Sequence, residues 1–283
     1  MSDTMQQFDV LRVGGNSATT AADQVAREAA LEVRLNGEPF SVIMRTPGAD
    51  RDLAMGFLFT EGIIRTAADV QAVTAPAPDV IDVALSPSLA ASVPALVGTR
   101  RHVTLNSSCG MCGRRSLESL DLQAAPLPIV WHVAAAVVAE LPQALRDAQQ
   151  VFAETGGLHA AALFGQDGRI EASAEDVGRH NAVDKLIGRM LTAGRLPLSD
   201  MLLFVSGRSS FEIVQKAWQA GLPLVAAVSA PSSLAVSLAR QSGITLIGFV
   251  RDGRFNIYAH QARVDCRATP ARTVGAAADS WGS

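Results

Sequence analysis

Residues 201–250 read MLLFVSGRSSFEIVQKAWQAGLPLVAAVSAPSSLAVSLARQSGITLIGFV, and this stretch decides the fold class. Short apolar runs at 201–206, 223–229 and 244–250 are typical of buried strands, and the segments between them carry helical patterns. Strands that alternate with helices in this way are joined by right-handed crossovers, which produce a parallel sheet. The stretch therefore predicts an α/β fold.

The segments on either side extend the same pattern. The run LHAAALF at 158–164 and the run RIEAS after it are expected to form two strands, and a helix is expected over 175–193. On the other side, the turn RDGR leads the chain back into FNIYA. We therefore expect residues 131–261 to form a three-layer α/β/α sandwich with a mixed sheet.

The N-terminal part of the chain predicts a second, smaller domain. Two alternating runs flank Asn36-Gly37, a dipeptide typical of a type I′ hairpin turn because both residues tolerate positive φ. A buried helix is expected at 50–60 and a strand at 79–86. Together they predict a smaller α+β domain over residues 29–130, which also carries the two close cysteines.

The two ends of the chain have a different composition. Residues 1–28 are polar or rich in alanine and are expected to be disordered, and residues 262–283 are expected to form a flexible tail. The first residues do not resemble a secretory signal, and no apolar run approaches the length of a membrane span. We therefore expect a cytoplasmic protein.

The bulk composition excludes several classes of partner. The formal net charge is -3 and the sequence pI is near 6.0, which gives no general attraction to nucleic acid or to an anionic membrane. Three cysteines in 283 residues do not form a disulfide framework. A reducing compartment is the simplest interpretation, and any anion site must be built locally from a few arginines and backbone amides.

The segment LNSSCGMCGRR contains Cys109 and Cys112, separated by two residues. This spacing supports half of a zinc site, a dithiol redox couple or a sulfur-carrying nucleophile. A zinc site is disfavoured because Cys266 stands alone, and because no second close pair of ligands is present in the sequence. Arg114 and Arg115 favour a thiolate, so we expect an exposed reactive thiol; spacing alone leaves disulfide exchange and sulfur transfer open.

The segment EDVGRHNAVDK at 175–185 is the second candidate site. Acidic capping and polar pairs such as Asp176 with His180 would explain several of its residues. They do not explain Gly178, because glycine inside a helix costs about 1 kcal/mol relative to alanine. Close approach of the backbone to a ligand would explain it, so Gly178, Arg179 and His180 are candidates for a binding site.

Three further segments allow either a binding or a structural interpretation. The junction Ser206-Gly207-Arg208-Ser209-Ser210 lies between a strand and a helix, where amides and a guanidinium suit a phosphate, although a serine-capped helix fits as well. His159 is more often a structural histidine than a catalyst, and only its proximity to other candidates supports a role. The stretch at 255–260 fits an edge strand as well as a surface for a planar ligand.

Taken in order, six motifs resemble the FdhD family of formate dehydrogenase accessory sulfurtransferases, over about residues 30–260. The motifs are GFLFTEGII (56–64), SSCGMCG (107–113), ETGGLHAAAL (154–163), EDVGRHNAVDKLIG (175–188), SGRSSFEIVQKA (206–217) and RFNIYA (254–259). The resemblance implies a cytosolic sulfur carrier, and a main domain with a fold similar to cytidine deaminases. Those deaminases carry zinc-binding motifs at two helix starts. The matching starts here contain no thiol, so we expect the fold without the zinc and no intrinsic metal.

The resemblance also implies roles and partners. Cys109 would accept persulfide sulfur from an IscS-type cysteine desulfurase and transfer it to the bis(molybdopterin guanine dinucleotide) molybdenum cofactor, with Cys112 as its partner. The recipient would be the catalytic subunit of a formate dehydrogenase, and the carrier would be a homodimer. The same site would admit a guanine nucleotide. The residues expected to bind the cofactor are Gly178, Arg179, His180, His159, Ser206, Gly207, Arg208, Ser209, Ser210, Phe255, Asn256, Ile257, Tyr258, Ala259 and His260.

Two other functions compete with the sulfur carrier. One is a chaperone that binds the molybdenum cofactor and whose cysteines only respond to redox state. The other is a dithiol oxidoreductase. A gain of sulfur on Cys109 would favour the carrier over both of them.

Overall fold

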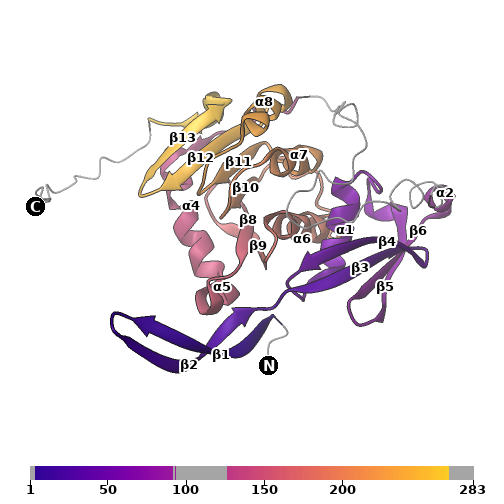
Figure 1. The fold of residues 1–283 in the computed structure, drawn as a ribbon. Coiled ribbons are helices and arrows are strands. Elements are labelled where there is room, and N and C mark those ends of the chain that lie inside the picture. The colour runs from indigo at the N-terminus through magenta and orange to yellow at the C-terminus, as the bar shows by residue number, and fades with distance from the viewer. Residues whose placement is uncertain (1–3, 92, 94–125, 268–283) are drawn as a thin grey trace, which may run out of the picture.

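The computed structural model describes residues 4–91, 93 and 126–267, and its elements carry the labels of Figure 1. Cys109 and Cys112 lie outside the described residues. Among the helices that the structure does describe, none combines the length and the apolar character needed to cross a membrane.

The larger part of the molecule is built on one mixed six-stranded sheet. Its strand order is β13-β12-β11-β10-β8-β9. The three strands β10, β11 and β12 are parallel, while β8 and β13 run antiparallel to their neighbours. The strands are β8 (His159–Phe164), β9 (Ile170–Asp176), β10 (Leu202–Val205), β11 (Leu224–Ala227), β12 (Thr245–Arg251) and β13 (Arg254–Ala259). The predicted α/β class with a mixed sheet is therefore confirmed.

Helices cover both faces of this sheet, as Figure 1 shows. Along β10, Leu203 and Val205 join the apolar cluster under α6, α7 and α8, whereas Leu202 and Phe204 join the cluster under α4. Both sets are buried because successive side chains of a strand point to opposite faces. The helices are α4 (Ala135–Ala148), α5 (Gln150–Thr155), α6 (Arg179–Thr192), α7 (Phe211–Gln219) and α8 (Ser233–Ser242).

A four-stranded sheet forms the core of the smaller part. Its order is β4-β3-β6-β5, and the hairpin between β3 and β4 turns at Asn36 (φ 51°) and Gly37 (φ 84°), as the sequence predicted. The helix α1 (Asp50–Thr60) packs its apolar residues against this sheet. The strands are β3 (Ala29–Leu35), β4 (Glu38–Arg45), β5 (Val70–Ala77) and β6 (Val80–Leu85); the short helices η1 (Ala67–Asp69) and α2 (Pro87–Ala90) flank β5 and β6.

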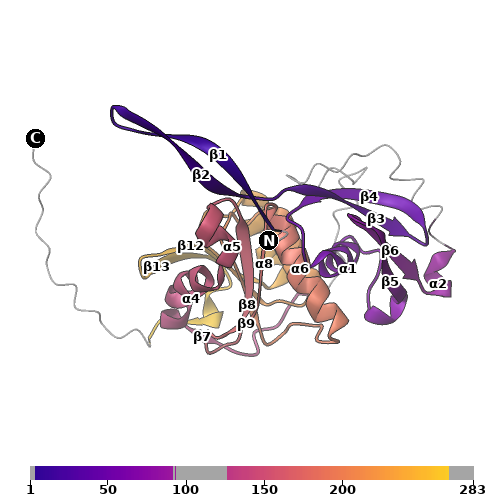
Figure 2. The same ribbon diagram turned by 90° about the horizontal axis from the view of Figure 1, so that it is seen from below.

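The two parts meet where α1 crosses α6 (Figure 2). A Cβ atom at Gly56 of α1 would overlap the backbone carbonyl of Asp184, and one at Gly188 of α6 would overlap the carbonyl of Asp52. Only glycine allows the two helix backbones to approach so closely. The position of the small sheet relative to the large one therefore depends on these two glycines.

The described residues of the segment 1–28, from residue 4 onward, differ from the prediction of disorder. The strands β1 (Met5–Gly14) and β2 (Ser17–Ala26) pair over their whole length and form a hairpin that projects from the body in Figures 1 and 2. Gly15 supplies the turn with φ 57°. The hairpin was missed because its strands are mostly exposed, so they lack the apolar alternation that marks a half-buried strand.

Two other boundaries are corrected. Residues 262–267 were expected to belong to a flexible tail, but η3 (Gln261–Arg263) is followed by β14 (Val264–Asp265), which pairs with β7 (Val133–Ala134); residues 268–283 lie outside the described residues. The Arg263 side chain has no exposed surface and donates to the carbonyls of Gly243 (3.2 Å) and Pro128 (2.9 Å). The helix expected over 175–193 begins only at Arg179, because β9 continues through Asp176.

Candidate functional site

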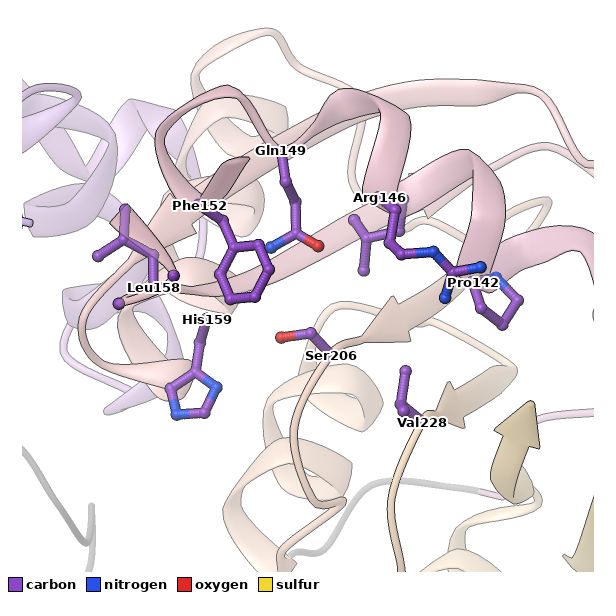
Figure 3. A pocket seen from close by; sticks show the side chains of 11 residues that line it. Pro142, Arg146, Gln149, Phe152, Leu158, His159, Ser206 and Val228 are labelled. Atoms are coloured by element: carbon purple, nitrogen blue, oxygen red, sulfur yellow. The ribbon is translucent and has the colours of Figure 1, made fainter. Parts of the chain in front are cut away.

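The candidate site lies at the edge of the large sheet where the parallel strands β10 and β11 end. Ligands of open α/β sheets collect at this edge because the helices that follow the strands leave a crevice there. A pocket of about 480 Å³ opens between the sheet edge and the helices α4 and α5 (Figure 3). Its lining includes His159 from the start of β8, Ser206 from the end of β10 and Val228 from the end of β11.

The structure brings His159 together with the junction after β10. Ser206 and Ala160 exchange two hydrogen bonds, from the Ala160 amide to Ser206 Oγ and from the Ser206 amide to the Ala160 carbonyl, both 2.9 Å. A Cβ at Gly207 would lie 3.4 Å from His159 Nδ1 and 3.6 Å from Arg179 Cδ. The predicted candidates His159, Ser206, Gly207 and Arg179 are therefore neighbours, although they come from three different segments.

The imidazole of His159 is half-buried in this group. Burial lowers the pKa of His159, and the positive charges of Arg179 and Arg208 lower it further, while Asp176 opposes the shift. The ring is therefore neutral at pH 7, with one nitrogen as a donor and the other as an acceptor. A neutral ring can donate a hydrogen bond to a ligand and accept one from it, whereas the two guanidinium groups beside it can only donate.

Gly178 has a different role from the one expected. It is the N-cap of α6 and lies outside the helix, with φ −98°. A Cβ there would come within 2.8 Å of Asn181 Nδ2, and the Gly178 amide donates to Asp176 Oδ1 at 2.8 Å. The glycine therefore makes room for the side chain of Asn181. That contact accounts for the glycine without invoking a ligand.

His180 lies in the interior between α6 and α7. Its Nε2 is 3.1 Å from Ser210 Oγ and 3.8 Å from Glu212 Oε2. Burial lowers the pKa of His180 to about 3, and Arg179 and Lys216 add to this effect. Burial raises the pKa of Glu212, but hydrogen bonds from Ser210 and from a backbone amide outweigh it, so the net shift is downward. His180 is thus a neutral buried histidine.

Other polar residues of 175–185 link α6 to neighbouring segments through buried hydrogen bonds and an ion pair. Lys185 Nζ forms a buried ion pair with Asp176 at 2.7 Å and donates to the Thr46 carbonyl at 3.0 Å. Asn181 Nδ2 donates to Asp176 Oδ1 and to the Met44 carbonyl, both at 2.8 Å. The structural alternative of a surface pair between Asp176 and His180 does not hold, because Asp176 instead bonds Lys185 and Asn181 in the interior.

A second buried ion pair lies where α1, α6 and α7 meet. Lys216 Nζ donates to both carboxylate oxygens of Asp184 and to Thr60 Oγ1, each at 2.8 Å. Burial raises the pKa of Asp184, and the charge and hydrogen bonds of Lys216 oppose that shift. The three hydrogen bonds satisfy both charges, so this cluster joins the small and large parts of the molecule.

The residues of the junction at 206–210 do not all face the same way. Ser209 has no exposed surface, and its carbonyl accepts the amide of Ser232 at 3.0 Å. Ser210 contacts His180, whereas Arg208 is exposed and close enough to lower the pKa of His159. Only Ser206, Gly207 and Arg208 therefore remain near the pocket.

The expected cofactor-binding stretch at 255–260 is divided among several environments. Phe255 and Ile257 pack toward the core under α4, and Tyr258 packs toward the opposite core. Ala259 is buried, and His260 Nε2 is 3.0 Å from the Arg240 carbonyl. A strand cannot present all of these side chains on one face, so they do not form a single surface for a planar ligand.

Two residues of this stretch do line a second pocket, of about 400 Å³, at the turn between β12 and β13. Phe255 and Asn256 lie there with Phe249, Arg251 and Arg254. Phe249 has φ 56°, which is uncommon for a bulky residue, and the guanidinium of Arg251 lies 5.6 Å from the centre of its ring. Since β12 is parallel to β10 and β11, this pocket opens at the same edge of the sheet as the first.

The sequence provided no signal for several lining residues. Arg146 on α4, Phe152 on α5 and Gln149 between the two helices contribute to the first pocket, but they lie within an ordinary helical pattern of the sequence. Arg251 and Arg254 belong to the turn RDGR, which the sequence marked only as a turn. Within the described ranges, no group of three or more His, Cys, Asp or Glu side chains is arranged to hold a metal ion.

Comparison with known proteins gives a consistent result. The sequence model of the FdhD/NarQ family matches residues 26–265. A sulfur carrier protein FdhD of Streptomyces avermitilis is 45% identical over 96% of this chain and 100% of its own length. Another from Anaeromyxobacter dehalogenans is 49% identical over 90% of this chain and 92% of its own length. A crystal structure from Desulfotalea psychrophila, described as a formate dehydrogenase accessory protein, superposes with a TM-score of 0.74 at 24% identity, covering 92% of this chain and 99% of that one.

Proposed function

This chain belongs to the FdhD/NarQ family, and we propose that it is a sulfur carrier that serves a formate dehydrogenase. The observation that carries the proposal is the match to sulfur carrier proteins over nearly their whole length, together with a close thiol pair, Cys109 and Cys112, inside the matched residues. A carrier needs one accessible thiolate to hold sulfur. Arg114 and Arg115, directly after the pair, favour that charge state.

The proposed reaction has two steps. The Cys109 thiolate attacks the outer sulfur of a persulfide on an IscS-type cysteine desulfurase; a new S–S bond forms on Cys109, and the desulfurase leaves as a thiolate. In the second step the Cys112 thiolate attacks Cys109 Sγ, the outer sulfur leaves as sulfide to the molybdenum of the substrate, and a Cys109–Cys112 disulfide forms. The two thiols supply the two electrons that reduce the sulfur. A cellular dithiol must then reduce the disulfide before the next cycle.

The proposed substrate is the bis(molybdopterin guanine dinucleotide) molybdenum cofactor, before its insertion into the catalytic subunit of the dehydrogenase. The edge of the large sheet supports this choice because it carries two pockets of about 480 and 400 Å³ and several cationic side chains. Arg208 and Arg179 lie near the first pocket, and Arg251 and Arg254 line the second. Guanidinium groups bind phosphate oxygens in pairs, and the substrate carries pyrophosphates.

The proposal extends to fold and assembly. We propose that residues 131–261 form a three-layer sandwich like that of cytidine deaminases, which the helices on both faces of the sheet support. We also propose that residues 29–130 form a separate α+β domain, that the carrier acts as a homodimer, and that it works in the cytoplasm. The low cysteine content supports a reducing compartment.

The decisive experiment tests sulfur loading on Cys109. The purified chain is incubated with a cysteine desulfurase and cysteine, and intact-mass and peptide spectra are recorded. We expect wild-type protein to gain the mass of one sulfur on Cys109. Cys109→Ala should gain none and should fail to mature the dehydrogenase, whereas Cys112→Ala should still load sulfur but release it slowly.

Two outcomes would contradict the proposal. A Cys109→Ala variant that matures its client enzyme at the wild-type rate would exclude the carrier mechanism. A wild-type protein whose thiols remain unmodified, or form only the Cys109–Cys112 disulfide, would favour a cofactor chaperone or a dithiol oxidoreductase. Cys266, which is exposed, provides the matched control as Cys266→Ala, and this variant should load sulfur normally.

A further inference from the structure

The hairpin of β1 and β2 is an arm with an open edge. Its two strands pair with each other over ten residues each and form a sheet of their own, and Figures 1 and 2 show the arm projecting from the body. The helix α5 packs against β2, while the outer edge of β1 pairs with no other strand that the structure describes. An open edge of this length is a template for pairing with a further strand.

The edge of β1 lacks the features that keep sheet edges apart. Residues 5–14 contain no proline and no lysine, and their register with β2 is continuous, without a bulge. Natural sheets use such features to prevent pairing between edges. The strand also exposes large apolar side chains, with Leu11 66% and Val13 71% exposed. The sequence of β1 therefore favours pairing at this edge.

The turn of the arm fixes which backbone groups face the open edge. Gly14 and Ser17 flank a two-residue turn, so they form a hydrogen-bonded pair, and such pairs then recur at every second residue along the ladder. The even-numbered residues of β1 therefore bond to β2. The odd-numbered residues, from Gln7 to Val13, direct their N–H and C=O groups to the open edge, where another strand could bond to them.

The charges of β1 select one register for pairing with a second copy of the same strand. Two antiparallel copies related by a two-fold axis overlap most when the axis lies at Asp9 or at Val10. An axis at Asp9 would place two carboxylates directly opposite each other, which is destabilising. An axis at Val10 places Val10 opposite its own copy and Phe8 opposite the partner's Arg12, where a ring and a guanidinium attract each other. No like charges are then directly opposite.

We propose that the arm is the interface between two copies of this chain, with β1 of one copy antiparallel to β1 of the other and centred on Val10. The two arms form one four-stranded sheet, which provides the stability that an isolated two-stranded hairpin lacks. This inference rests on the proposed homodimer and names the surface that forms it.

The base of the arm adjoins the candidate site. Gly157 lines the first pocket, and a Cβ at Gly157 would lie 3.3 Å from the Cβ of Ala26 at the end of β2. Pairing of the two arms would therefore hold β2 in place against this wall of the pocket.

Cross-linking tests the register. Partners in a non-hydrogen-bonded antiparallel pair have Cα atoms about 4.5 Å apart, which a disulfide can span. The full chain, with its three native cysteines replaced by serine, receives Val10→Cys and is oxidised with copper phenanthroline. We expect most of this variant to migrate as a linked dimer on a non-reducing gel. Val13→Cys is the matched control and should stay unlinked, because in this register Val13 lies roughly 20 Å from its own copy.

The oligomeric state tests the interface without added cysteines. Light scattering during gel filtration should give twice the chain mass of 29.6 kDa for the wild type. Val10→Asp should give the single chain mass at the same concentration, because two carboxylates would then meet at the axis. Thr20→Asp adds the same charge to an exposed position of β2, which the pairing does not use, and should leave the dimer intact.

Three outcomes would overturn the proposal: a wild-type monomer, a Val10→Asp variant that remains a dimer, or equal cross-linking of Val10→Cys and Val13→Cys. The cross-linking result keeps the test valid even if Val10→Asp does not fold.

The two proposals fail separately. A wild-type protein that loads sulfur on Cys109 but whose arms do not pair at Val10 would contradict only the arm interface. A chain whose arms pair at Val10, but whose wild-type form takes no sulfur on Cys109, would contradict the carrier function and leave the arm interface standing.

Discussion

At the scale of single residues, the structure separates groups that resemble each other in the sequence. His159 and His180 lie beside glycine-rich turns, yet His159 lines a pocket whereas His180 is 5% exposed and contacts Ser210 and Glu212. Both histidines are neutral at pH 7 because burial and nearby cations disfavour the imidazolium. The difference that matters is access to a ligand, which depends on the surrounding elements.

The neutral state of His180 predicts a loss of stability in acid. Its pKa is about 3 in the folded protein and near 6.5 in the unfolded chain, so the unfolded state binds more protons below pH 6.5. Stability contributed by this group is present above pH 6.5 and is lost as the pH falls. Between pH 7 and pH 5 the loss is about 2 kcal/mol. Urea unfolding of wild type and His180→Gln at both pH values measures it.

We expect His180→Gln to lose less stability between pH 7 and pH 5 than the wild type does. The exposed His132 offers the control, because His132→Gln should keep the wild-type pH dependence. Equal pH dependence in wild type and His180→Gln would mean that His180 is not held neutral in the folded state.

At the scale of elements, the crossing of α1 and α6 organises the molecule. Gly56 and Gly188 bring the two backbones together, and the cluster of Lys216, Asp184 and Thr60 lies at the same crossing. The helix α6 thereby contacts the small sheet's helix on one side and the large sheet on the other. A change in the spacing of this crossing would move the start of α6, where Arg179 lies beside Gly207 and His159.

Gly188→Ala should destabilise the protein strongly. In an open helix this substitution stabilises by about 1 kcal/mol, but here the new methyl group would overlap the Asp52 carbonyl. We expect a net loss of about 3 kcal/mol, because the backbones must separate. Chemical denaturation checks the value, and Gly14→Ala is the control, since a Cβ at Gly14 meets no atom within 4 Å. A Gly188→Ala protein as stable as the wild type would show that the helices are farther apart.

At the scale of the whole molecule, stability is distributed unevenly. The large sheet has both faces covered, and its strands β10 and β11 are fully buried. The hairpin of β1 and β2 is mostly exposed and exposes Phe8, Leu11 and Val13. An isolated two-stranded hairpin is marginally stable in water, so this element depends on whatever covers it.

Hydrogen exchange should reveal this difference. For the monomeric chain we expect amides of residues 5–26 to exchange orders of magnitude faster than those of β10 and β11, because opening the hairpin exposes little apolar surface. Exchange followed by mass spectrometry at low protein concentration tests this expectation. Protection of the hairpin equal to that of β10 would contradict it, and protection that appears only at high concentration would mean that a second copy covers the hairpin.

Much of the fold could be predicted because its signals are local. The type I′ turn at Asn36-Gly37 and the strand–helix alternation of 201–250 each depend on residues close together in the sequence. The hairpin at the N-terminus and the strand β14 were missed because their strands carry weak apolar patterns. The candidate site was predicted only in part: His159, Ser206, Gly207 and Arg208 converge as expected, whereas Ser209 and His260 do not.

The sequence by itself determined the fold class, the family resemblance and the thiol pair, because these depend on residue order and short-range periodicity. Only the tertiary structure decided which side chains share a space. It placed Gln149 and Phe152 in the same pocket as His159. It also showed that Gly178 leaves room for the side chain of Asn181, where the sequence suggested a ligand contact. Burial and proximity between distant segments arise from packing, and no local pattern encodes which side chains of α4 and α5 will lie against the edge of a sheet formed by other segments.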